Sequence, residues 1–182
     1  MSGVGPTFQE LVQEFFTGYL VEQRAVSPRT VIAYRDAFSL LLEHAERTLG
    51  KAPTALVLGD LDESLIASFL NDLETRRGNA ARTRNARLAA IRSFLQFAAQ
   101  RDVANLTSVT RALSVLMKRF ERPMLGFLSR EQLLAILALP GTDWVAMRDR
   151  VLLQLLYNTG ARVSDMVAVR VDDVVTGGGA HS

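Results

Sequence analysis

The sequence predicts a mainly α-helical protein, and three observations support this fold class. Apolar residues recur at intervals of three and four through almost every segment, which is the spacing of one helix face. Residues that favour helix starts and helix ends bound these apolar runs. Hydrophobic residues make up 48% of the 182 residues, which supports a packed core and argues against a disordered chain.

Four helices are expected in the first half of the chain. Short connections between them predict a compact bundle, which we expect to form an independent domain over residues 1–100. Helix-starting and helix-ending residues mark most of the boundaries. The expected helices are residues 7–21, residues 27–50 from the N-cap Ser27 to Gly50, a third helix from Asp60 or Asp62 to Gly78, and residues 80–100.

The second half of the chain predicts a linker followed by more helix. Residues 101–128 are less regular and are expected to link the domains, and residues 129–182 are expected to form part of a second domain. Alternating valines from Val167 onward are typical of a strand. The expected elements are a short helix from the N-cap Ser129 to Pro140, a helix over residues 144–158 anchored by Trp144, a short helix after Gly160, and a strand over residues 167–175 that runs into Gly177.

Composition and charge restrict the function classes. The net charge is only +2, but residues 76–101 hold seven arginines and no acidic residue, and such a block suits an anionic polymer. The chain has no cysteine, and His44 and His181 are isolated, so we expect no disulfide, no metal site and no cofactor. No signal-peptide pattern and no apolar run of about 18 residues is present, so no membrane span and a cytoplasmic location are expected.

One short segment, residues 155–166, carries the clearest chemical signal. An apolar helix is expected to end at Gly160, because glycine adopts the left-handed conformation that terminates helices, and Arg162 follows at a helix junction. A guanidinium held there offers a rigid fork of donors for two phosphate oxygens and stabilises charge in phosphoryl transfer. From spacing alone, a surface arginine that is solvated or paired with Asp165 is the more frequent outcome.

This segment resembles the pattern T-G-x-R-x-S-E/D that carries the first catalytic arginine of tyrosine recombinases, the Xer-type and phage-integrase enzymes. Two further segments match in the family's order. Residues 82–98 are similar to its fourth N-terminal helix, and residues 27–36 are similar to its second. The resemblance covers residues 8–175, and it implies a SAM-like four-helix core-binding domain followed by the first helices and first strand of a catalytic domain.

The resemblance also implies roles for individual residues. Arg162 would clamp the scissile phosphate, and Asp165, where the family more often has glutamate, would support it. A helix-start acid favoured by the helix dipole is an equal alternative for Asp165. For each arginine of the fourth helix, the alternative is a solvated or ion-paired side chain. The candidate DNA-binding residues on that helix are Arg82, Thr83, Arg84, Asn85, Arg87 and Arg92.

The family's other catalytic residues have no match in the sequence. No lysine follows Lys118, no tyrosine follows Tyr157, and His181 has no arginine three positions on. We therefore expect a C-terminally truncated recombinase that binds double-stranded DNA, with other recombinase protomers as further partners, and that is not catalytically competent alone. The alternatives are a non-catalytic DNA-binding regulator that competes for recombination sites, and a helical protein-interaction module. Salt-sensitive binding to duplex DNA separates the last from the others.

Overall fold

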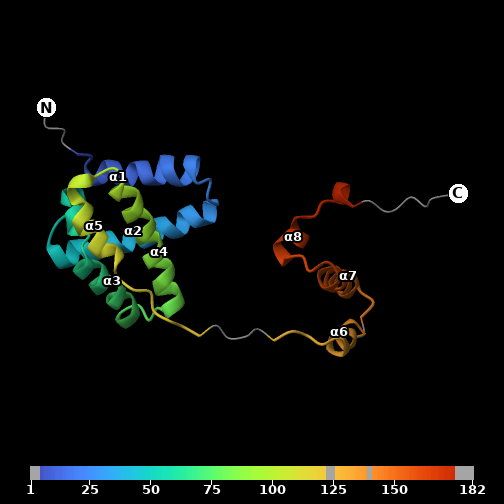
Figure 1. The fold of residues 1–182 in the computed structure, drawn as a ribbon. Helices are drawn as coiled ribbons and strands as arrows, with labels where there is room; N and C mark the ends of the chain where they lie inside the picture. The colour runs from blue at the N-terminus through green and yellow to red at the C-terminus, as the bar shows by residue number, and fades with distance from the viewer. Residues whose placement is uncertain (1–4, 122–125, 139–140, 175–182) are drawn as a thin grey trace. The chain divides into compact units, whose positions relative to one another are not determined.

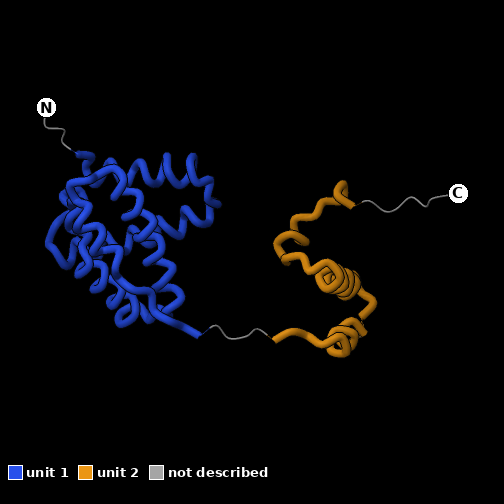
Figure 2. Tube along the Cα trace, viewed as in Figure 1, with its two compact units in different colours: residues 1–122 blue, residues 123–182 orange. Residues whose placement is uncertain are grey.

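A computed structural model describes residues 5–121, 126–138 and 141–174. The chain divides into two compact units, residues 1–122 and residues 123–182 (Figure 2). In both units the described residues form helices, turns and loops with no β-strand. The mainly α-helical fold class is therefore confirmed.

The first unit is a helical bundle in which α4 packs against α2, α3 and α5 (Figure 1). Its described residues also include one π-helical and three short 3₁₀ segments. The α-helices are α1 (Phe8–Glu14), α2 (Pro28–Leu49), α3 (Glu63–Thr75), α4 (Ala81–Ala99) and α5 (Leu106–Leu113), and the other segments are the π-helix η1 (Phe15–Gln23) and the 3₁₀ helices η2 (Pro53–Ala55), η3 (Leu58–Asp60) and η4 (Val103–Asn105).

The helix starts follow from local hydrogen bonds that the sequence signals. Ser27 Oγ accepts a hydrogen bond from the backbone N–H of Thr30 at 3.3 Å, so Ser27 is the N-cap of α2. Of the two candidate caps for α3, Asp62 is the one used. Its Oδ1 accepts from the N–H of Leu65 at 2.8 Å, whereas Asp60 lies in η3.

The core of the first unit is a cluster of aromatic rings around Phe94. The side chain of Phe94 is 0% exposed. Its ring centroid lies 5.8 Å from that of Phe8, 5.5 Å from Phe15, 5.1 Å from Phe38 and 6.5 Å from Phe97. Because these rings come from α1 and the adjoining η1, from α2 and from α4, one cluster joins three parts of the chain that are distant in sequence.

The first unit continues past the domain boundary expected at residue 100. Helix α5 packs against α3 and α4, and its residues Val109 and Ala112 are buried. Helix α5 therefore belongs to the bundle, although it lies within residues 101–128, where the sequence predicts the linker. The physical reason is that an eight-residue helix is marginal in water, so α5 is stable only when its apolar face is packed.

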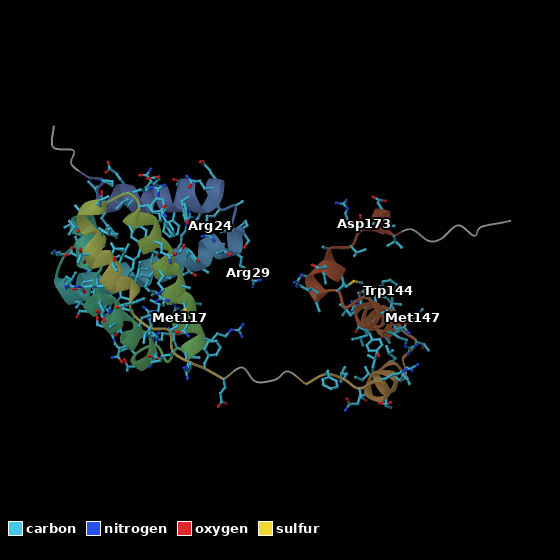
Figure 3. The ribbon with its side chains drawn as sticks, viewed as in Figure 1. Arg24, Arg29, Met117, Trp144, Met147 and Asp173 are labelled. Atoms are coloured by element: carbon cyan, nitrogen blue, oxygen red, sulfur yellow. The ribbon has the colours of Figure 1, made fainter. Side chains whose placement is uncertain are left out.

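The second unit has few buried side chains. Leu133, 6% exposed, is the single buried residue among those described in this unit. Trp144, expected to anchor its helix, is instead 76% exposed (Figure 3). The helices are α6 (Arg130–Leu137), α7 (Trp144–Thr159), α8 (Val163–Ala168) and the 3₁₀ helix η5 (Val171–Asp173).

The strand expected over residues 167–175 is absent from the described part of that range. Helix α8 continues to Ala168, and η5 occupies Val171–Asp173. Alternating valines favour a strand only where a neighbouring strand completes the backbone hydrogen bonds, and none of the described segments pairs with these residues. Val175 and Gly177 lie outside the described residues.

Candidate nucleic-acid interface

Helix α4 carries all of the DNA-binding candidates, and its first turn is an open, positive helix end. The N-cap, Ala80, makes no side-chain hydrogen bond, so the first N–H groups of the helix have no cap. A helix N-terminus carries partial positive charge. Arg82 and Thr83 are exposed within this turn, where they add a cation and a hydroxyl group.

Arg87 lies one turn further along α4 and is partly buried among other charges. Burial lowers the pKa of its guanidinium, the nearby cation of Arg77 lowers it further, and Asp36 of α2 opposes both effects. The Nη1 atom of Arg87 is buried and has no hydrogen-bond partner within the described residues. Arg77 itself pairs with Glu43, with 3.5 Å between Nη2 and Oε2. Arg87 thus keeps an unused donor that suits an anionic oxygen.

Arg84 and Asn85 lie inside the first unit, with exposures of only 7% and 8%. Together with the partly buried Arg92, they hydrogen-bond to the backbone of residues 113–118, which comprise the last residue of α5 and the segment after it and which we call the strap. These three side chains therefore bind the chain's own backbone. Arg82 and Thr83, by contrast, are exposed, and the Nε atoms of Arg84 and Arg92 are, like Arg87 Nη1, buried without a hydrogen-bond partner among the described residues.

Two exposed cations that the sequence analysis did not single out flank the turn between η1 and α2. They are Arg24 and Arg29 (Figure 3). Tyr19 Oη lies 3.4 Å from Arg24 Nη1 and accepts its hydrogen bond, which raises the pKa of Arg24. Both arginines fall outside the arginine-rich window of residues 76–101. The signal that could have found them is the matched second-helix segment, residues 27–36, which contains Arg29 and begins three residues after Arg24.

In the second unit, the turn at Arg162 has the geometry that its sequence predicts. Gly160 ends α7 with a φ of 63°, and its N–H donates to the carbonyl oxygen of Leu156 at 2.9 Å. Arg162 is the N-cap of α8, and Asp165 Oδ2 accepts a hydrogen bond from its backbone N–H at 3.4 Å. Asp165 thus holds the backbone of the turn, while Arg162 is exposed.

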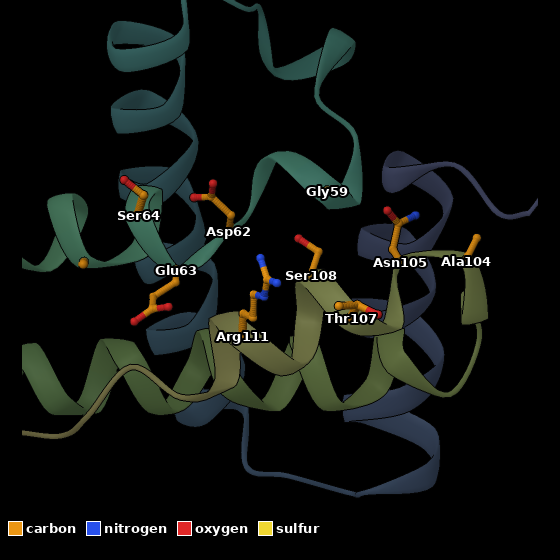
Figure 4. A pocket seen from close by; sticks show the side chains of 10 residues that line it. Gly59, Asp62, Glu63, Ser64, Ala104, Asn105, Thr107, Ser108 and Arg111 are labelled. Atoms are coloured by element: carbon orange, nitrogen blue, oxygen red, sulfur yellow. The ribbon is translucent and has the colours of Figure 1, made fainter.

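A polar pocket of about 730 Å³ lies between α3 and α5 (Figure 4). Asp62, Glu63 and Arg111 are among its lining residues, and none of the DNA-binding candidates contributes to it. The described ranges contain no group of three or more His, Cys, Asp or Glu side chains that could hold a metal ion. A search of the same ranges for a helix with the length and apolar character of a membrane span found none.

Comparisons with known proteins show which family the chain resembles. The family model of the phage integrase N-terminal SAM-like domain matches residues 12–102. Two proteins of Sinorhizobium fredii named "Putative integrase/recombinase" are similar to this chain. One, y4rC, is 41% identical over 94% of the chain, and the other, y4rD, is 39% identical over 90% of it. The tyrosine recombinase XerC of Pelotomaculum thermopropionicum is 29% identical over 87% of the chain. No solved structure matches.

The matches cover only part of each relative, and they can be located on the helices of this structure. This chain spans 52%, 59% and 51% of the length of those three relatives. The matched family model begins within α1, includes α2, α3 and α4, and ends three residues after α4. It therefore covers the aromatic core except Phe8, and it covers all the DNA-binding candidates on α4. The chain belongs to the tyrosine recombinase family, and its first unit is the family's N-terminal SAM-like domain.

Proposed function

We propose that the first unit binds duplex DNA for site-specific recombination, as the core-binding domain of a tyrosine recombinase. The observation that carries this proposal is the state of Arg87. Its Nη1 is a buried donor without a partner among the described residues, and the neighbouring Arg77 makes its surroundings more positive. The Nη1 atom itself is enclosed, as are the unpartnered Nε atoms of Arg84 and Arg92, so it is the partly exposed guanidinium of Arg87 as a whole, beside a second cation, that suits a phosphate.

The start of α4 supplies further donors for the same ligand. Arg82 and Thr83 are exposed beside the uncapped N–H groups of the helix, and helix N-termini bind phosphates through such groups. Contacts of this kind set the position of a protein on DNA without reading its sequence. We assign Arg82 and Arg87 to the phosphate backbone, and Thr83 to either a phosphate or a base edge.

For the second unit, we propose that Arg162 binds a phosphate and that Asp165 holds the turn on which Arg162 stands. The family resemblance of the segment supports this assignment, as do the exposed position of Arg162 and the backbone hydrogen bond to Asp165. The activity proposed for this chain is DNA binding, and other recombinase protomers are proposed as its protein partners on the DNA. Arg162 is the one residue of the family's catalytic set for which the sequence offers a match.

The test is the salt dependence of binding to a labelled duplex, measured by fluorescence anisotropy. Each phosphate contact contributes about −0.9 to the slope of log K against log salt concentration. Arg82→Ala and Arg87→Gln should each make the slope shallower by about that amount. Arg111→Ala removes one exposed positive charge at the pocket between α3 and α5, so it is the matched control and should leave the slope unchanged.

Two results would count against the proposal. If the wild-type chain shows no salt-sensitive DNA binding, a helical protein-interaction module becomes the better hypothesis for its function. If Arg111→Ala lowers the slope as much as Arg82→Ala and Arg87→Gln do, the effect comes from net charge, and α4 is not the interface.

A further inference from the structure

The strap (residues 113–118) begins at the last residue of α5 and then has no regular secondary structure, and side chains of α4 hydrogen-bond to its backbone. Arg92 Nη2 donates to the carbonyl oxygen of Leu113 at 2.7 Å, and Arg84 Nη1 donates to that of Leu116 at 3.1 Å. Because the later strap residue meets the earlier helix residue, the strap runs antiparallel to α4. It therefore leads back toward the N-terminal end of that helix.

Asn85 makes the most specific of these contacts. Its Nδ2 donates to the carbonyl oxygen of Lys118 at 2.7 Å, and its Oδ1 accepts from the backbone N–H of Lys118 at 3.0 Å. The Oδ1 atom also accepts from Arg84 Nη1 at 3.1 Å. The amide thus pairs with both backbone groups of Lys118, as a residue of a neighbouring strand would. Since Asn85 is buried, removing its amide would leave backbone groups without partners.

This anchor places cations beside the positive end of α4. Lys118 Nζ lies 2.7 Å from Glu74 Oε2, yet its side chain is still 55% exposed. The next residue, Arg119, is also exposed. Arg82 precedes Asn85 by three residues, and residues three apart are neighbours on a helix surface. Asn85 therefore holds the backbone of Lys118 next to the turn that carries Arg82.

We propose that Asn85 is a positioning residue, which fixes the strap so that Lys118 and Arg119 join Arg82 in one phosphate-binding surface at the N-terminal end of α4. The ligand is the backbone of duplex DNA, so this inference rests on the proposed function. The burial of Asn85 and the pairing of both Lys118 backbone groups make the strap a fixed part of that surface.

A double-mutant cycle tests the proposal. The wild-type chain, Asn85→Ala, the pair Lys118→Ala with Arg119→Ala, and the triple variant are titrated with a labelled duplex at several salt concentrations. If Asn85 acts through the strap, Asn85→Ala should lower the salt slope by up to about 1.8, the value for two lost phosphate contacts. The triple variant should lose no more than the pair, because the two changes remove the same contacts.

Limited proteolysis reports on the strap itself. Trypsin cleavage after Lys118 and Arg119 should be faster in Asn85→Ala than in the wild type. Asn85→Asp keeps the acceptor for the Lys118 N–H but places a carboxylate oxygen against the Lys118 carbonyl oxygen, so it should also speed cleavage of the strap. Circular dichroism confirms that each variant keeps its helices, and Asn85→Asp carries the test if Asn85→Ala does not.

The outcomes are separable. Wild-type binding with an unchanged slope in Asn85→Ala, or losses that add in the triple variant, would overturn the inference and leave the proposed function standing. Tighter binding by Asn85→Ala would also overturn it, because the strap would then be a removable cover. Absence of salt-dependent binding by the wild-type chain would refute the proposed function itself, and the inference with it.

Discussion

Replacing Phe94 with alanine should destabilise the first unit more than other single substitutions on α4. The ring is fully buried and lies within 6.5 Å, centroid to centroid, of four other rings. Burial of a phenylalanine side chain is worth about 1.5–3 kcal/mol, and the cavity left in a packed core adds to that loss. Phe94→Ala should therefore cost about 3–5 kcal/mol, and Phe94→Leu, which fills much of the space, about 1–2 kcal/mol.

The assay is thermal and urea unfolding of the full chain, followed by circular dichroism. A loss of this size should lower the melting temperature of the first unit by about 10–20 °C for Phe94→Ala. Phe127 provides the control, because it is the same residue type and is 90% exposed. Phe127→Ala should change stability by no more than about 0.5 kcal/mol. The reasoning fails if Phe94→Ala costs less than about 1 kcal/mol, or if both variants cost the same.

Two further predictions concern packing and pH. Amide hydrogens of α6, α7 and α8 should exchange faster than those of α2 and α4, because the second unit buries only Leu133 among its described residues; equal protection by hydrogen-exchange mass spectrometry would contradict this. Burial lowers the pKa of His44 below its ordinary value of 6.5, against the opposing charge of Asp72, so the unfolded chain binds more protons in that range. The free energy of unfolding, measured with urea, should therefore fall as the pH is lowered from 8 through 6.5 toward 5. His44→Gln should weaken this pH dependence. An unchanged pH dependence in the variant would refute the assignment to His44.

The helix boundaries could be predicted because their signals are local. Ser27 accepts a hydrogen bond from a residue three positions later, and Gly160 ends α7 through a bond to a residue four positions earlier. Sequence spacing contains that information directly. The family pattern around Arg162 likewise lies within one turn, and the structure places its backbone as the pattern predicts.

The hydrogen-bond partners of the α4 side chains could not be predicted in the same way. Helical spacing places Arg84 on the side of Leu88 and Ile91 and places Arg82 elsewhere, but it does not show that Arg84 binds the backbone of the strap. The partner of Asn85, Lys118, lies 33 positions away in the sequence. A hydrogen bond of that range appears in no local pattern. The missing strand has a related cause, since alternating valines carry no information about whether a neighbouring strand is present.

The way in which Asn85 holds the strap has a consequence for variation and engineering. The anchor recognises the main chain of Lys118, a feature common to nearly all residues, and makes no demand on the Lys118 side chain. Proline is the exception, because it lacks the N–H. The exposed strap positions Leu116 and Met117, and Lys118 itself, are therefore open to replacement without loss of the anchor. On the proposed function, these are the positions at which related proteins could diverge in DNA affinity while keeping the same scaffold, and at which a designer could retune it.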